Sequence, residues 1–129
     1  MTPQDKFMTA LCAWRENRSG GDPGMTSVIN VIVNRCARSG LSPYRIVTAR
    51  MQFSSITAPG DPQLAVWPEW DDPQWLGARD LVSMAADGKL VDITGGAMNY
   101  YAADIDPPYW AADMVYTVTV AGQRFYRNA

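Results

Sequence analysis

The sequence predicts a mainly α-helical domain of the α+β class, with a small β-hairpin near its C-terminal end. Two observations support this fold class: apolar residues recur at helical spacing through most of the chain, and the residues from Tyr116 onward alternate as strands do. The chain has 129 residues, of which 47% are hydrophobic, and this length suits one buried core. We therefore expect a single domain over residues 1–129.

The predicted helices begin with a capping residue followed by proline, whose missing N–H costs nothing in the first turn. A glycine ends most of them. Residues 51–70, rich in proline breakers, should be irregular apart from one short helical turn. The helices are predicted from Thr2-Pro3 to about Asn17, from Asp22-Pro23 to about Gly40, after Ser42-Pro43, and from Asp72-Pro73 to Gly88.

Apolar faces on these helices indicate the core. Phe7, Leu11 and Trp14 share one face of the first helix, and Trp75 should be buried on the last. The second helix carries the clearest apolar repeat in the chain, so we expect it to be central. Its apolar residues are Met25, Val28, Ile29, Ile32, Val33 and Cys36.

The predicted hairpin pairs residues 116–120 with residues 124–127 across a turn at Ala121-Gly122. Because this element follows a long helical region, a cleft could form between the helices and the hairpin.

Composition excludes several kinds of chemistry. The chain contains no histidine, which removes Ser-His-Asp and Cys-His catalysis and most imidazole metal sites. We expect no metal and no cofactor. The net charge is −2 without a basic run, so nucleic acid is not an expected partner, and no segment is apolar enough to insert into a membrane. Cys12 and Cys36 fall on apolar helix faces and should be buried free thiols rather than a disulfide.

Glutamate is scarce, with only Glu16 and Glu69 in the chain. Glu16 lies in the last helical turn before a glycine-rich break, at the edge of the apolar face. The negative end of the helix dipole and partial burial would both favour its protonated form, which suits a general acid at a glycosidic oxygen. The alternative is an exposed glutamate paired with Arg15 or Arg18.

Other candidates are weaker. Glu69 lies between Trp67 and Trp70, whose rings could stack on sugar, but we favour a loop held to the surface by its indoles. Asp104 and Asp106 could supply the second carboxylate that most glycosidases use.

Six stretches of the chain resemble the cell-wall hydrolase family that includes the spore cortex-lytic enzymes. That family carries E-A-R-G-E, an N-R helix end, Q-F-S, G-A-T-H-Y-Y, a short proline-led stretch and I-G-N-H-R-F-Y in this order. The corresponding residues here are Glu16 to Gly20, Val28 to Arg35, Gln52 to Ser54, Gly96 to Tyr101, Pro108 to Ala111 and Val120 to Tyr126.

The resemblance implies a lysozyme-like, lytic-transglycosylase-like helical fold and a catalytic role for Glu16. Three departures stand out: Gly20 replaces the second glutamate, Asn99 and Gln123 replace two histidines, and the turn glycine is shifted by one position. Both histidine replacements keep hydrogen-bonding capacity but do not titrate near neutral pH. The implied substrate-binding residues are Gln52, Phe53, Ser54, Asn99, Tyr100 and Tyr101.

The resemblance predicts a peptidoglycan-degrading enzyme that cuts the β-1,4 bond between N-acetylmuramic acid and N-acetylglucosamine, as a lytic transglycosylase. A hydrolytic muramidase and an inactive peptidoglycan-binding domain stay open as alternatives. Because no signal peptide or wall-binding module is evident, we expect a monomeric bacteriophage endolysin made in the host cytoplasm. It would reach the cell wall through a membrane hole made by a holin.

Overall fold

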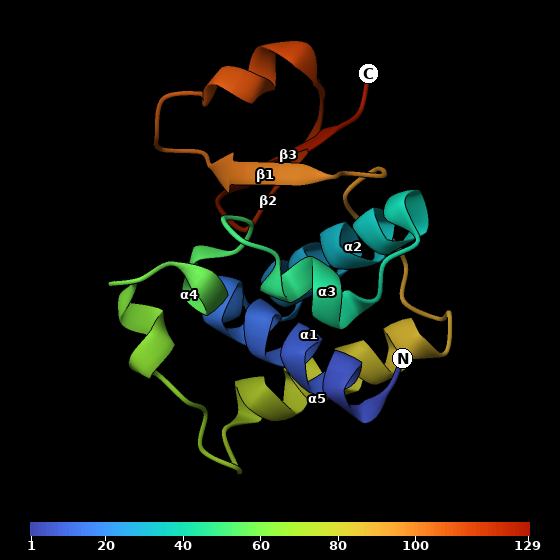
Figure 1. Ribbon diagram of the computed structural model, residues 1–129, viewed down its shortest axis with the longest axis vertical. Coiled ribbons are helices and arrows are strands. Elements are labelled where there is room, and N and C mark those ends of the chain that lie inside the picture. The colour runs from blue at the N-terminus through green and yellow to red at the C-terminus, as the bar shows by residue number, and fades with distance from the viewer.

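The computed structural model describes all 129 residues and places a helical body beneath a small antiparallel sheet (Figure 1). The mainly α-helical class with a C-terminal β element is confirmed. The elements are α1 (Pro3–Asn17), η1 (Arg18–Gly20), α2 (Gly21–Ser39), α3 (Pro43–Thr48), α4 (Ser54–Thr57), η2 (Pro62–Ala65), α5 (Pro73–Ala86), β1 (Asn99–Ala102), η3 (Tyr109–Asp113), β2 (Val115–Val120) and β3 (Gln123–Arg127).

Three of the four predicted helix caps are confirmed. Thr2 forms a capping box with Asp5, Ser42 accepts from the N–H of Arg45, and Asp72 accepts from the N–H of Gln74. The fourth is wrong: α2 begins at Gly21, so Asp22 lies inside its first turn and makes no cap. The break after α1 is a turn of 3-10 helix rather than a loop.

The main core fills the space between α1, α2, α3 and α5. Leu11, Trp14, Ile29 and Trp75 are all buried in it, as the apolar repeats predicted. Phe7 is an exception at 46% exposure: it lies near the start of α1, where its ring meets that of Trp75 at an interplanar angle of 78°. No helix is both long enough and apolar enough to cross a membrane.

Other apolar positions predicted for helix faces also differ from expectation. Val33 is 37% exposed because it lies at a surface pocket beside the end of α5, where Ala85 is another lining residue. Cys12 is buried, Cys36 is half-buried, and both are free thiols as predicted.

The sheet has the strand order β1-β3-β2, with both pairings antiparallel. The hairpin of β2 and β3 is confirmed, whereas β1 was not predicted. Phe125 of β3 is fully buried against Val31 of α2 and Ala97, which joins the sheet to the helical body. The hairpin turn uses two positive φ angles, 46° at Ala121 and 79° at Gly122, as two-residue hairpin turns require.

The opposite face of the sheet has its own small aromatic core. Tyr101 and Tyr126 stack at 5.5 Å between ring centroids, and Trp110 meets both rings edge-on. The segment containing η3 therefore packs on the outer face of the sheet (Figure 1).

Candidate active site

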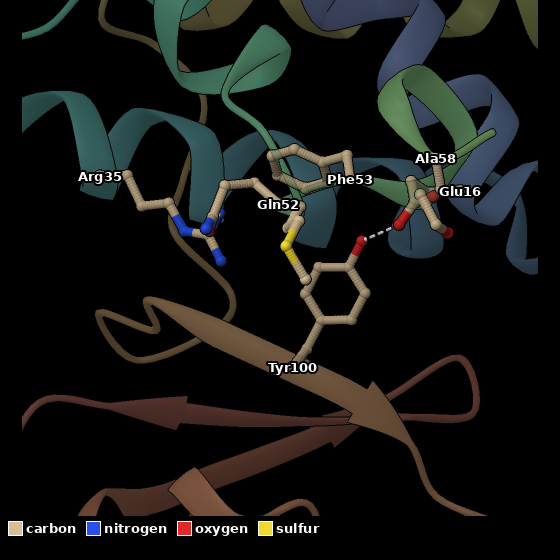
Figure 2. Close-up of a pocket in the computed structure, with 8 residues that line it drawn as sticks. Glu16, Arg35, Gln52, Phe53, Ala58 and Tyr100 are labelled. Carbon is tan, nitrogen blue, oxygen red and sulfur yellow. Dashed lines mark hydrogen bonds between the residues drawn. The ribbon is translucent and has the colours of Figure 1, made fainter.

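A pocket of about 350 Å³ lies where the end of α1, the loop before α4 and strand β1 meet. Figure 2 shows the side chains that converge there. Glu16 is the one carboxylate among them, and every other lining residue is neutral except Arg35. The lining residues are Glu16, Arg35, Met51, Gln52, Phe53, Ser54, Ala58 and Tyr100.

The centre of the pocket is a hydrogen bond between Glu16 and Tyr100. The phenol O–H of Tyr100 donates to Oε1 of Glu16 at 2.5 Å, which is a short hydrogen bond. Burial, and then the negative charge of Glu16, raise the pKa of Tyr100 well above its usual value. Tyr100 therefore stays a donor at neutral pH, and Oε2 of Glu16 is left for other partners.

Neither neighbouring arginine pairs with Glu16. Arg15 donates instead to the backbone oxygens of Ser55 and Val66, both at 3.1 Å. Arg18 donates to Gln63 at 2.9 Å and lies over the ring of Trp14. The alternative of a surface glutamate paired with an adjacent arginine is therefore wrong.

Arg35 connects three parts of the pocket wall. Its guanidinium donates to the backbone oxygen of Met98 at 2.7 Å, to Oε1 of Gln52 at 3.1 Å and to Oδ1 of Asn99 at 2.9 Å. It also lies 5.1 Å from the ring centroid of Phe53. All these partners are neutral, and through them Arg35 fixes the loop and β1 against α2.

The structure brings together four of the residues predicted to contact substrate, namely Gln52, Phe53, Ser54 and Tyr100. Asn99 lies behind them, accepting from Arg35 and donating weakly to the sulfur of Met114. Arg35 was not among the predicted substrate-binding residues, although it belongs to the N-R motif. That motif, which lies inside α2, was the signal that could have identified it.

The prediction that Tyr101 contacts substrate is wrong. Tyr101 is buried in the aromatic core on the far side of the sheet, where its hydroxyl lies 3.0 Å from that of Tyr126. Consecutive residues of a strand point to opposite faces, so Tyr100 and Tyr101 cannot both face one pocket. Asp104 and Asp106 are exposed beyond β1 and do not line the pocket either.

The segment around Glu69 is a second correction. We expected its indoles to hold it to the surface, but Trp67 is 61% exposed and Trp70 is 82% exposed. The segment is attached to α1 in three ways: the backbone oxygen of Val66 accepts from Arg15, the Arg15 guanidinium lies 4.5 Å from the centroid of the Trp67 ring, and Asp72 accepts from the indole N–H of Trp14 at 3.2 Å.

Two departures from the family motifs are in direct contact. A Cβ added to Gly20 would lie 2.7 Å from the Cβ of Ala121, which is shorter than real carbon atoms approach. The amide of Asn17 also donates to the backbone oxygen of Ala121, at 3.4 Å. The glycine at position 20 thus makes room for an alanine in the hairpin turn.

No cluster of three or more His, Cys, Asp or Glu side chains is arranged to hold a metal ion. What the pocket offers chemically is one carboxyl group, one phenol donor and a guanidinium beside a mixed apolar and amide wall.

Comparison with known proteins places the chain among wall-degrading enzymes. A family model described as Cell Wall Hydrolase matches residues 19–126, beginning three residues after Glu16. No curated protein matches the chain.

Two solved structures have the same fold. One is the catalytic domain of the germination-specific lytic transglycosylase SleB from Bacillus anthracis, with a TM-score of 0.76, 21% identity, and coverage of 98% of this chain and 97% of that one. The other is the catalytic domain of the Bacillus cereus SleB protein, with a TM-score of 0.77, 20% identity, and coverage of 98% and 92%. The predicted lysozyme-like, lytic-transglycosylase-like fold is confirmed.

Proposed function

The chain belongs to the cell wall hydrolase family, and we propose that it cleaves the glycan strand of peptidoglycan with Glu16 as its general acid and base. The observation that carries this proposal is the position of Glu16. It is the single carboxyl group in the pocket, and Tyr100 holds one of its two oxygens. The bond that we propose as the target is the β-1,4 bond between N-acetylmuramic acid and N-acetylglucosamine.

In the proposed reaction, Oε2 of protonated Glu16 gives its proton to the glycosidic oxygen as the bond to the muramoyl C1 breaks. The resulting carboxylate then takes a proton from the muramoyl 6-hydroxyl, whose oxygen closes on C1. The products are a free N-acetylglucosamine end and a 1,6-anhydromuramoyl end, and Glu16 is protonated again. This route needs neither water nor a second carboxylate, which agrees with the absence of Asp104 and Asp106 from the pocket lining.

Tyr100 and Arg35 would assist in different ways. The Tyr100 hydroxyl stabilises the Glu16 carboxylate once Glu16 has given up its proton, because a hydrogen bond to a charged acceptor is stronger than one to a neutral acceptor. Arg35 would hold Gln52 and Asn99 in place for contacts with sugar hydroxyls and N-acetyl groups.

Digestion of purified peptidoglycan followed by mass spectrometry tests the proposal. The wild-type chain should release anhydromuramoyl ends, and Glu16→Gln should lower the rate by about 10²- to 10⁴-fold, the range for general acid–base catalysis. Asp104→Asn is the matched control and should cut at the wild-type rate. Reducing muramic acid ends would indicate a hydrolytic muramidase, and retention of most activity by Glu16→Gln would refute the role of Glu16.

We also propose that the chain acts as an endolysin of a bacteriophage, which rests on the resemblance alone. Expression in a bacterial host with and without a holin tests this role. Lysis that requires the holin would support it, and lysis without one would contradict it.

A further inference from the structure

The segment of residues 66–72 carries two exposed indoles on the surface between η2 and α5. Trp67 is 61% exposed and Trp70 is 82% exposed, so two large aromatic rings lie open to solvent on one short segment. Single exposed apolar residues are common, but large aromatic rings gathered on one short segment indicate a contact site. The function proposed above does not use either ring.

Trp67 is held in a fixed orientation. The guanidinium of Arg15 lies 4.5 Å from the centroid of its ring. Arg15 is itself fixed, because it donates to the backbone oxygens of Ser55 at 3.1 Å, Val66 at 3.1 Å and Leu64 at 3.5 Å. One face of the Trp67 indole is therefore covered by a cation, and much of the remaining ring is open to solvent.

Burying the Arg15 guanidinium in this position costs free energy. The Arg15 side chain is only 7% exposed, yet its hydrogen-bond partners are neutral backbone oxygens. A buried charge costs free energy unless its hydrogen bonds are well formed. Here the bonds join α1 to α4 and to the 66–72 segment, so the buried guanidinium acts to fix the backbone that carries Trp67.

The residues that hold Trp67 in place are chain neighbours of residues that line the pocket. Arg15 directly precedes Glu16 in α1, and Ser55 directly follows Ser54 of the pocket wall. The Trp67 ring lies 4.5 Å from the Arg15 guanidinium, and the Cα atoms of Arg15 and Glu16 are about 3.8 Å apart. With the lengths of the two side chains added, the ring lies within roughly 20 Å of the Glu16 carboxyl, a span that a few sugar rings can cover.

We propose that the exposed face of Trp67 stacks on a sugar ring of the glycan strand, beyond the rings held in the Glu16 pocket. The axial C–H groups of an aminosugar would pack on the indole, while its hydroxyl and N-acetyl groups stay hydrated. This contact rests on the proposed function and makes it more specific. It selects strands long enough to reach from Glu16 to Trp67.

The chain-length dependence of cleavage tests this contact. Trp67→Ala should raise KM for long glycan strands about tenfold, as expected for loss of one aromatic contact, and leave kcat unchanged. Tetrasaccharide fragments should be cut by this variant as by the wild type. Trp67→Phe should recover part of the loss. Trp70→Ala is the matched control and should change KM less than twofold, because no cation or ring fixes Trp70.

A binding measurement separates failure of this contact from failure of the proposed function. In the Glu16→Gln background, adding Trp67→Ala should reduce pelleting with purified peptidoglycan by a similar factor. If strands are cut but Trp67→Ala matches the wild type at every length, the Trp67 contact is refuted alone. If no glycan is cut, the function is refuted, and unchanged pelleting would refute the contact too. Thermal unfolding confirms that each variant is folded.

Discussion

The Tyr100 hydroxyl donates to Oε1 of Glu16 at 2.5 Å, although the two residues are 84 positions apart in the chain. This bond connects the last turn of α1 to the first strand of the sheet. It therefore depends on the packing of the sheet against α2, where Phe125 meets Val31. The chemistry of Glu16 and the docking of the sheet are coupled.

Tyr100→Phe removes this hydrogen bond and keeps the ring, which packs 5.2 Å from that of Phe125. We expect the variant to fold normally and to cut peptidoglycan about ten- to a hundredfold more slowly, since a hydrogen bond to a charged group contributes about 1.5–3 kcal/mol. Initial rates of turbidity loss measure the change. A rate equal to that of the wild type would mean that Tyr100 does not assist Glu16.

Asn99→His should make activity depend on pH. Asn99 Oδ1 accepts from Arg35 at every pH, whereas an imidazole nitrogen accepts only when neutral. The positive charge of Arg35 lowers the pKa of a nearby histidine, so the variant should lose activity as pH falls through or below about 6.5. A pH–rate profile checks this. The wild type should show no such additional loss, and a variant profile that overlays it would contradict the prediction.

The contact between positions 20 and 121 predicts non-additive stability. Gly20→Ala should destabilise the fold, because its Cβ would meet Ala121 at 2.7 Å. Ala121→Gly should be stabilising by about 1 kcal/mol, since φ is 46° there and a Cβ is strained at positive φ. In the double variant the cost of Gly20→Ala should shrink. Urea unfolding of all four chains measures the coupling, and strict additivity would argue against it.

The hydrogen-bonded carboxylate of Asp5 should make the folded protein less stable in acid. Burial alone would raise its pKa, but hydrogen bonds from Thr2 and from the N–H of Tyr44 outweigh burial and leave the pKa below its usual value. A lowered folded-state pKa stabilises the protein above the unfolded-state value near 3.9 and stops doing so as pH falls through the folded value.

Asp5→Asn should therefore lower the free energy of unfolding by about 1–2 kcal/mol at pH 7. Below about pH 4 the difference in this free energy between the variant and the wild type should become smaller. Urea unfolding at several pH values checks this. Asp104→Asn is exposed and serves as the control, with no expected change in slope. A gap between wild type and Asp5→Asn that stays constant down to pH 2 would contradict the account.

The helices could be predicted because their signals are local. Thr2, Ser42 and Asp72 each precede a proline and bond to a backbone N–H two or three residues on. The same pattern failed at Asp22, where the chain leaves α1 through a 3-10 turn and Gly21 already begins the next helix. Whether a cap-like residue caps depends on the path of the preceding residues.

The site could be predicted only in part, because its contacts join distant segments. Glu16 and the residues of the Q-F-S motif were identified from their motifs, and they do meet. Strand β1 gave no alternating pattern, since three of its four residues are half-buried. Without that strand the sequence could not show that Tyr100 faces the pocket while Tyr101 faces away.

Three consecutive residues at the end of α1 each contact a different part of the chain: Trp14 bonds to Asp72, Arg15 to the backbone of Val66, and Glu16 to Tyr100. The first two of these contacts fix Asp72 and Val66, so residues 67–71 are attached to α1 at both ends. Substitutions at residues 68–71 leave both attachments in place, because the bonds of Trp14 and Arg15 and the stacking on Trp67 lie outside those four residues. In the proposed contact with the glycan strand, the reach of the enzyme along its polymer is thus set by a segment that takes no part in the reaction at Glu16.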